Sequence, residues 1–172
     1  MTFQLTEPIL VIGLGGVGTR LAEKTKKSLN SDCLMISHDQ NDITAENSIK
    51  ISTKSVVNPS THLIRGSTLE TSDEIKKNIA NYSTIILMSN LAGKAGTGIG
   101  PIVSKICKQE QKNLLSFAVM PFKFEKERIF QSGIALKRIR QDSQCTIVVD
   151  NDALLDSNPD LTQKQCYDIS NN

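Results

Sequence analysis

The sequence predicts an α/β fold in which helices cover both faces of a doubly wound, mostly parallel sheet. One observation is a set of short runs, apolar at successive positions, as in strands buried on both faces. These runs are Ile9–Ile12, Cys33–Ile36, Thr84–Met88, Leu114–Met120 and Cys145–Val149. A second observation is that segments with helical spacing of apolar residues separate the runs. A third is that no repeat or linker interrupts this alternation, which typically builds right-handed crossovers on one sheet.

Size and composition are those of a single soluble domain covering residues 1–172. The net charge of +2 and the aromatic content of 4% argue against nucleic acid as a partner. No apolar run approaches the roughly 20 residues that span a bilayer, and Met1–Glu7 lacks a signal-peptide pattern. The cysteines lack paired metal spacing, and three of the four are expected to be reduced and buried (Cys33, Cys107, Cys145 and Cys166). These features predict a cytoplasmic protein.

The first half of the chain predicts a strand–helix–strand unit followed by a weakly patterned region. A glycine motif follows the first strand, and an inward helical stripe comes next at Leu21, Ala22, Thr25 and Leu29. Alternation around Ile49 and Ile51 predicts a short edge strand. Asn58-Pro59-Ser60 predicts a turn.

The second half alternates helices and strands to its end. Ser72 is expected to cap a helix that turns Ile75 and Ile79 inward. Residues 89–101 are interpreted as a glycine-rich loop, with Pro101 in the first turn of the helix that follows. A further helix is expected to turn inward the residues Ile129, Gly133, Ile134, Leu136 and Ile139. A last helix is expected to run from about Thr162 to the terminus.

The glycine-rich stretch is the strongest functional signal. It holds four glycines in the eight residues 93–100, between the carboxyl end of a strand and the amino end of a helix. Free backbone N–H groups and the positive end of the helix dipole meet there, and glycine lets an anion approach the backbone. The functional interpretation is a phosphate cradle. The structural alternative is a tight turn that binds nothing.

The first glycine motif, Gly13, Gly15 and Gly18, matches Gly-x-Gly-x-x-Gly after a strand and before a helix. By itself it fits a Rossmann-type NAD domain or an adenylating enzyme. For NAD, Asp39 is the nearest acidic residue for the ribose, although a turn cap is the more ordinary role for it. A second glycine turn favours a mononucleotide triphosphate held from both sides by backbone N–H groups.

With these motifs in order, the sequence resembles the tubulin/FtsZ superfamily, the FtsZ side in particular. Ala92-Gly93-Lys94-Ala95-Gly96-Thr97-Gly98 is similar to its Gly-Gly-Gly-Thr-Gly-Thr/Ser-Gly signature. Pro121-Phe122-Lys123-Phe124-Glu125-Lys126-Glu127-Arg128 resembles its Pro-Phe-x-Phe-Glu-Gly-x-x-Arg, one residue shorter. Ser132-Gly133-Ile134, Asp142-Ser143 and Asn151-Asp152-Ala153-Leu154-Leu155 follow further family motifs at similar spacing.

The resemblance implies a site for GTP or GDP, with Mg²⁺ as a further candidate. The first turn would contribute Gly15, Gly16, Val17, Gly18, Thr19 and Arg20, and the second Gly93, Lys94, Ala95, Gly96, Thr97 and Gly98. Glu125 would accept from the ribose hydroxyls and Arg128 would lie over ribose and base. Asn151 would contact the guanine or ribose edge, Tyr167 would stack on the base, and Asn171 or Asn172 would read guanine.

Departures from the family pattern limit what the resemblance implies. Lys94 replaces a glycine and Ala95 a threonine, so a hydroxyl donor is lost, and Lys94 either replaces it as a charged phosphate partner or points into solvent. Of the loop that senses the terminal phosphate, normally glycine-rich with an Asn-Pro, Arg65-Gly66-Ser67-Thr68 is taken as the remnant. The family's second domain and acidic activating loop have no counterpart in residues 1–172.

The expectation is therefore guanine-nucleotide binding with little hydrolysis by this chain alone, since in that family hydrolysis takes place between subunits. The expected partners are further copies or FtsZ-like subunits. The alternatives are a Rossmann-type NAD or ATP binder and a non-binding partner that assembles with FtsZ. No catalytic set is identified: His38 and His62 are isolated, and Asp150 and Asp152 suit either a turn or water-mediated Mg²⁺. Gly96→Val is expected to abolish binding without unfolding.

Overall fold

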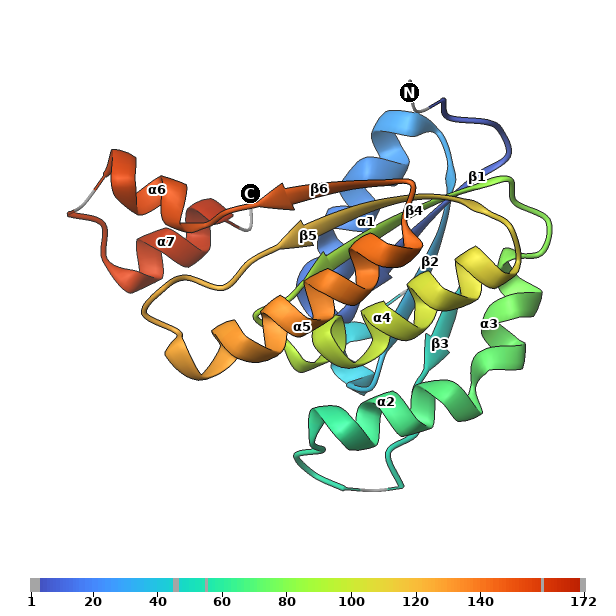
Figure 1. Cartoon of the computed structure of the whole chain (residues 1–172), viewed down its shortest axis with the longest axis horizontal. Coiled ribbons are helices and arrows are strands. Elements are labelled where there is room, and N and C mark those ends of the chain that lie inside the picture. The colour runs from blue at the N-terminus through green and yellow to red at the C-terminus, as the bar shows by residue number, and fades with distance from the viewer. Residues whose placement is uncertain (1–3, 45–46, 55, 159, 171–172) are drawn as a thin grey trace.

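The computed structural model describes residues 4–44, 47–54, 56–158 and 160–170, which form one six-stranded sheet with helices around it (Figure 1). All neighbouring strands are parallel, in the order β3-β2-β1-β4-β5-β6. The strands are β1 (Ile9–Leu14), β2 (Asp32–Ser37), β3 (Ser48–Lys50), β4 (Thr84–Asn90), β5 (Asn113–Val119) and β6 (Cys145–Val149). The predicted α/β class and the predicted strands, including the edge strand at Ile49, are confirmed.

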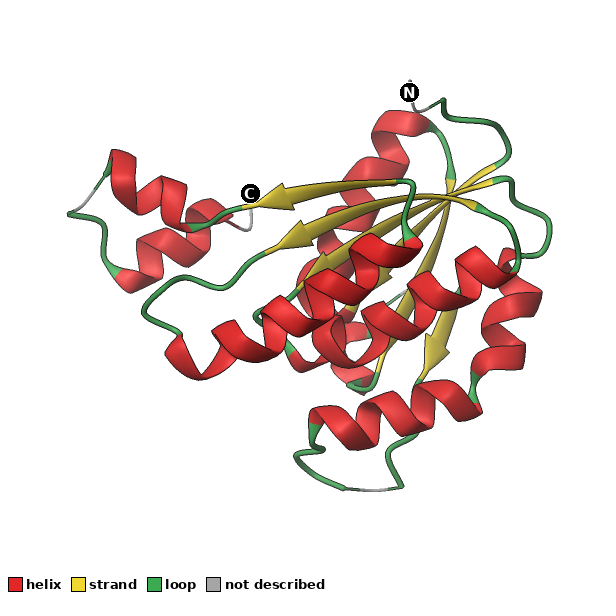
Figure 2. Ribbon diagram, in the orientation of Figure 1, coloured by secondary structure: helices red, strands yellow, loops and turns green. Residues whose placement is uncertain are grey.

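Helices cover the sheet from both sides (Figure 2). On one face α1 packs Ala22 against Val11, Met35 and Met88. On the other face α4 packs Ile99 and Val103 into the larger core cluster. The helices are α1 (Gly15–Leu29), α2 (Thr61–Glu70), α3 (Ser72–Ile79), α4 (Lys94–Gln109), α5 (Lys126–Asp142), α6 (Asp152–Ser157) and α7 (Gln163–Ser170), with a 3₁₀ turn, η1, at Gln40–Asp42.

The sheet has a topological switch point between β1 and β4. From β1 the chain proceeds to β2 and β3, and from β4 it proceeds in the opposite direction to β5 and β6. A crevice opens at the carboxyl ends of the strands where the winding direction reverses. Because α1 follows β1 directly and α4 follows β4, both glycine-rich segments lie at this crevice.

The largest correction concerns the stretch interpreted as a loop. Helix α4 begins at Lys94, so Gly96, Gly98, Gly100 and Pro101 all lie within it rather than before it. Close packing outweighs the low helix propensity of these glycines. An added Cβ on Gly98 would lie 2.8 Å from Ile64 of α2, and one on Gly100 would lie 3.1 Å from Ile139 of α5.

Several smaller predictions are wrong. Helix α2 occupies the weakly patterned region, so Arg65–Thr68 lie in a helix and not in a loop. Ser72 does not cap α3, since its hydroxyl donates to the Leu69 carbonyl (2.6 Å). In α5, Ile129 and Gly133 are exposed, because the buried face consists of Ser132, Ala135 and Ile139. Helix α6 was not predicted.

Leu29 was expected to face inward, yet it is 41% exposed. It borders a groove of about 610 Å³ on the α1 face of the sheet, together with Phe117 and Val149. Helix α1 covers the central strands and leaves this apolar strip open near its own C-terminal end.

The expectation that three of the four cysteines are reduced and buried is confirmed. The four cysteines are free thiols; Cys33, Cys107 and Cys166 are buried, and Cys145 is partly exposed. Burial raises the pKa of Cys107 to about 12, so this thiol stays protonated. None of the helices in the described part of the chain is long and apolar enough to cross a membrane.

Candidate functional site

The amino ends of α1 and α4 meet at the crevice between β1 and β4. Gly15 opens α1 in a left-handed conformation, with φ of +66°, and an added Cβ there would lie 2.7 Å from the Ala95 Cβ of α4. The residue before each helix, Leu14 or Gly93, offers no side-chain cap. The first turn of a helix has N–H groups without intrahelical partners. The structure therefore places two uncapped helix N-termini side by side.

Several glycines of these turns serve packing. A Cβ added to Gly13 would lie 2.5 Å from the Gly18 carbonyl oxygen. A Cβ added to Gly18 would lie 2.6 Å from the Met88 carbonyl oxygen. A Cβ added to Gly96 would overlap the Asn90 carbonyl oxygen. Because backbone atoms cannot move aside easily, Gly96→Val would disrupt the fold, and the expectation that it leaves folding intact is wrong.

The first turn of α4 has donors to offer. The first backbone bond that closes this turn runs from Thr97 N–H to the Gly93 carbonyl, at 3.2 Å. The preceding N–H groups, of Lys94, Ala95 and Gly96, therefore come before the helical hydrogen-bond ladder begins. The Thr97 hydroxyl is already engaged, since it lies 3.0 Å from the Gly93 carbonyl oxygen.

A carboxylate that the sequence did not single out, Asp42, lies beside the glycine turn that joins β1 to α1. Asp42 accepts a hydrogen bond from the Ser37 hydroxyl (2.6 Å), and an added Cβ on Gly16 would lie 2.6 Å from its Oδ1. A carboxylate is stabilised near a helix N-terminus by the helix dipole. The signal available in the sequence was only an acidic residue shortly after the second strand. Asp39, which had been considered for a ribose contact, instead caps the η1 turn by accepting from Asn41 N–H (2.9 Å).

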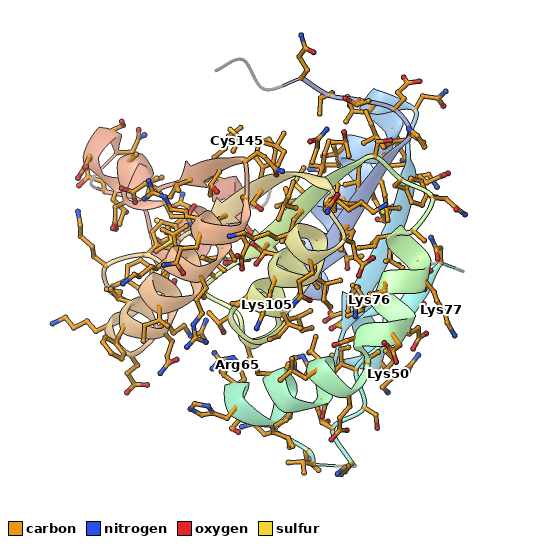
Figure 3. The ribbon with its side chains drawn as sticks, turned by 45° about the vertical axis from the view of Figure 1, so that its right-hand side comes forward. Lys50, Arg65, Lys76, Lys77, Lys105 and Cys145 are labelled. Carbon is orange, nitrogen blue, oxygen red and sulfur yellow. The ribbon has the colours of Figure 1, made fainter. Side chains whose placement is uncertain are left out.

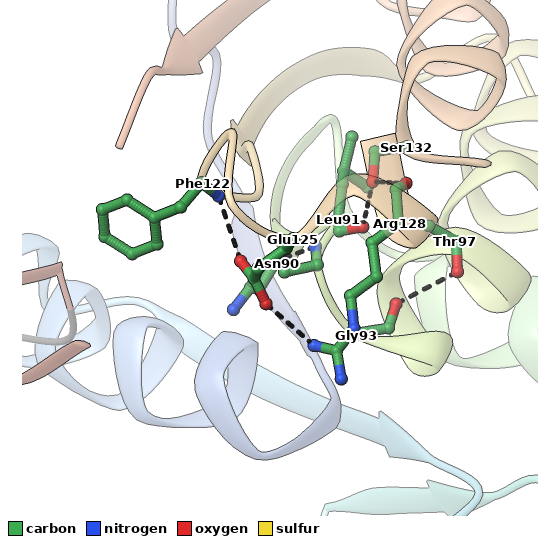
Figure 4. A network of polar contacts seen from close by, with 9 residues as sticks. Asn90, Leu91, Gly93, Thr97, Phe122, Glu125, Arg128 and Ser132 are labelled. Carbon is green, nitrogen blue, oxygen red and sulfur yellow. Dashed lines mark hydrogen bonds and ion pairs between the residues drawn. The ribbon is translucent and has the colours of Figure 1, made fainter. Parts of the chain in front are cut away.

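A polar network attaches the start of α5 to the second turn (Figure 4). Glu125 Oε2 accepts from Phe122 N–H (3.0 Å), and Oε1 pairs with Arg128 (3.2 Å). The Glu125 side chain is only 7% exposed, whereas that of Arg128 is 59% exposed. Ser132 Oγ lies 2.6 Å from the Leu91 carbonyl oxygen. The Glu125–Arg128 pair thus has a fixed carboxylate and an accessible guanidinium.

A hollow of about 360 Å³ lies between α4 and α5 at this point. Its lining includes Thr61 of α2, Gly93, Lys94 and Thr97 of the second turn, and Arg128 of α5. Two cations, Lys94 and Arg128, and one carboxylate, Glu127, line this hollow beside the N-terminus of α4. A phosphate or ribose on this side of the site would meet a net positive charge.

The loop after β6 is held by its own acidic residues. Asp152 accepts from Lys123 N–H (2.9 Å), and Asp150 accepts from Asp152 N–H (3.0 Å). Both contacts fit the turn role rather than metal binding. Asn151 between them is 4% exposed, and it has interactions of its own.

Of the remaining candidate residues, only some lie at the crevice. Val17 and Thr19 lie in the first turns of α1, and Arg20 is exposed there. Tyr167 belongs to α7, and Asn171 and Asn172 lie outside the described residues. Within the described ranges, no group of three or more His, Cys, Asp or Glu side chains is arranged to hold a metal.

The two histidines differ in environment. His62 is exposed on α2. Burial lowers the pKa of His38, at the end of β2, with Asp39 and Asp42 opposing the shift and Lys94 adding to it. The lowered pKa favours the neutral imidazole. Its Nδ1 is buried without a hydrogen-bond partner in the described part of the chain.

Comparison with known proteins finds one family. The model of the Tubulin/FtsZ family, GTPase domain, matches residues 8–159. Cell division protein FtsZ 1 of Halobacterium salinarum is 26% identical over an alignment that covers 97% of this chain and 45% of that protein. Cell division protein FtsZ of Haloferax mediterranei is 32% identical over 103 residues, covering 59% of this chain and 27% of that protein. The chain thus spans less than half the length of these curated relatives.

Solved structures show the same fold at lower identity. An empty FtsZ dimer from M. jannaschii superposes with a TM-score of 0.83 at 23% identity, covering 95% of this chain and 50% of that one. CetZ from Methanosaeta thermophila superposes with a TM-score of 0.73 at 19% identity, again covering 95% of this chain and 50% of that one. These likenesses establish the arrangement of strands and helices.

Proposed function

Because this chain belongs to the tubulin/FtsZ family and matches its GTPase domain, we propose that it binds a guanine nucleotide, GTP or GDP, at the crevice between β1 and β4. The observation that carries the proposal is the contact of two uncapped helix N-termini, at Gly15 and Ala95. Two such N-termini offer backbone N–H groups and the positive ends of two helix dipoles to one phosphate chain.

The first turn would hold the α- and β-phosphates through Gly15, Gly16, Val17 and Gly18, with Thr19 and Arg20 beside them. The second turn, Gly93–Gly98, would hold the phosphates from the other side, with the N–H groups of Lys94, Ala95 and Gly96 as its donors. Glu125, already fixed by Phe122 N–H, is suited to accept from ribose hydroxyls. Arg128 is accessible beside it for ribose and base.

On the base side we propose Asn151 for the guanine or ribose edge, Tyr167 for stacking, and Asn171 or Asn172 for reading guanine. These assignments rest on the family motifs. The position of Asn151 in the loop after β6, at the carboxyl edge of the sheet, supports the first of them.

Mg²⁺ would accompany the nucleotide rather than occupy a protein cage. Mg²⁺ is commonly bound through phosphates and one or two carboxylates, with water completing its shell. Asp42 is the carboxylate beside Gly16, so it is the residue that fits this role. The metal would offset the repulsion between Asp42 and the phosphates.

We further propose that the chain acts in the cytoplasm as part of a cell-division or related cytoskeletal polymer, with copies of itself or FtsZ-like subunits as partners. Hydrolysis by residues 1–172 alone is expected to be negligible, because the family's acidic loop has no counterpart in them. Phosphate release measured from the purified chain with GTP tests this, and rapid multiple turnover would contradict it.

A second candidate, a non-binding partner that assembles with an FtsZ, is favoured by the Asp42 carboxylate at the first turn. One experiment separates the two. The chain is purified in Mg²⁺, denatured, and the released small molecules are identified by chromatography. Guanine nucleotide supports the proposal. Adenine or nicotinamide nucleotides, or none after incubation with GTP, would contradict it.

A further inference from the structure

Lys94 links the second glycine turn to the loop that precedes α2. Its ammonium donates to Asn58 Oδ1 (2.6 Å) and to the Pro59 carbonyl (3.0 Å), across 36 and 35 residues of sequence respectively. From the sequence, this lysine could be either a phosphate partner or a solvent-pointing side chain. In the structure it is exposed, and its ammonium holds the Asn58-Pro59 loop against the start of α4.

The linked loop lies at the phosphate end of the site. Lys94 is the first residue of α4, next to Ala95, which contacts the first turn at Gly15. Helix α4 follows β4 after a short loop, so Lys94 lies near the carboxyl edge of the sheet. It also borders the hollow that Thr97 and Arg128 line.

The two acceptors of Lys94 are neutral oxygens. An ammonium has three N–H donors, and a charged phosphate oxygen adds to each hydrogen bond an ion-pair attraction that the neutral oxygens of Asn58 and Pro59 lack. A terminal phosphate that reached this ammonium would therefore compete with Asn58 and Pro59. A diphosphate, shorter by one phosphoryl group, would leave the link intact.

We infer that Lys94 is the residue that distinguishes a nucleoside triphosphate from a diphosphate, exchanging its bonds to Asn58 and Pro59 for the terminal phosphate. This rests on the proposed function. It makes the Asn58-Pro59 loop the part of the chain that is released when the triphosphate binds. The lysine thus replaces, with a charge, the hydroxyl lost at Ala95.

The test compares GTP and GDP affinities, by isothermal titration calorimetry in Mg²⁺, for the wild type and three variants. Lys94→Met should weaken GTP binding about tenfold or more and change GDP binding less than about threefold, since one charge-assisted bond is lost. Asn58→Ala should strengthen GTP binding about threefold, because the competing acceptor is removed. Lys105→Met is the charge-matched control, exposed on the same helix (Figure 3), and should change neither affinity.

Opposite effects of Lys94→Met and Asn58→Ala on GTP are the result that a merely structural link would not give. A link that only stabilises the loop would make both variants weaken GTP and GDP alike, and this outcome would overturn the inference. An unchanged GTP-to-GDP ratio in Lys94→Met would also overturn it while leaving the proposed site standing. Failure of the wild type to bind either nucleotide would instead refute the proposed function, and this inference with it.

Discussion

The turn after β1 and the turn after β4 both place a helix N-terminus at the switch point, but their glycines face different neighbours. In the first turn Gly15 needs its left-handed conformation, and Gly16 faces the Asp42 side chain. In the second turn Gly96 faces the backbone of Asn90, whereas Gly93 has only an ordinary contact, 3.6 Å from an added Cβ to the Asn90 carbonyl oxygen. The first turn is constrained by conformation and a nearby charge, the second by how tightly α4 packs on β4.

This difference shows that a high density of glycine has two separate causes here. Some glycines are required because helices and strands approach each other closely. Others leave backbone N–H groups accessible to an anion. Substitutions that separate these causes test whether the two turns act as one binding site.

The largest effect should come from substituting glycines within the second turn. Gly96→Val should lower the free energy of unfolding by at least about 3 kcal/mol, since its side chain would overlap the Asn90 backbone. Gly93→Ala should lower it by less than about 1 kcal/mol, because space exists for a methyl group. Urea denaturation followed by circular dichroism measures both. Equal stability of the two variants would show that α4 does not pack as described.

An intermediate effect should come from the charge beside the first turn. Without Mg²⁺, Asp42→Asn should strengthen nucleotide binding about fivefold to tenfold, because a negative charge near the phosphates is removed. The gain should shrink when Mg²⁺ is added. Fluorescence titration with a labelled GTP measures this. Asp39→Asn is the matched control, because it removes one negative charge from the same η1 turn while the amide oxygen can still cap that turn. No difference between Asp42→Asn and wild type in EDTA would place the phosphates away from Gly16.

The smallest effect on stability is expected at the amino ends of the strands, remote from both glycine turns. Tyr82 donates to Asp32 (2.7 Å), and this bond, with burial adding to it, raises the pKa of Tyr82 to about 12. A raised folded-state pKa means that the stabilisation is fully present below the ordinary pKa of about 10 and is lost as pH rises through about 12.

Tyr82→Phe should therefore cost about 0.5 to 1 kcal/mol near neutral pH, with the difference from wild type disappearing between pH 10 and 12. Urea denaturation at several pH values measures it. Nucleotide affinity should not change. A change in affinity would mean that the amino and carboxyl ends of the strands are energetically coupled, which would contradict the account of two independent regions.

Much of the fold could be predicted because a parallel sheet buried on both faces gives continuous apolar runs, as at Ile85–Leu87 and Leu114. The start of α4 could not, because glycine is a poor helix former and its helical role depends on contacts with Ile64 and Ile139, far away in sequence. Helix α2 was missed because its buried face includes Ser67 and Thr68 alongside Ile64, which gives no apolar period.

The parts of the candidate site that belong to sequence motifs could be predicted. The parts that depend on single side chains from loops could not. The two turns and the Glu125–Arg128 pair follow from sequence patterns and lie at the crevice or beside it. Asp42 and the partners of Lys94 follow from loop geometry, which brings residues 42 and 58 to the turns only in the folded chain. Polar loop residues carry no periodic signal that marks such contacts.

The central claim is that two helix N-termini at one switch point hold a single guanine nucleotide. Equilibrium titration of the 172-residue chain with a fluorescent GTP analogue in Mg²⁺, displaced in turn by GTP, GDP, ATP and NAD, tests it most directly. Saturable binding of one analogue per chain, displaced by GTP and GDP but not by ATP or NAD, is the predicted result. Absence of saturable binding, or displacement by ATP or NAD as readily as by GTP, would contradict it.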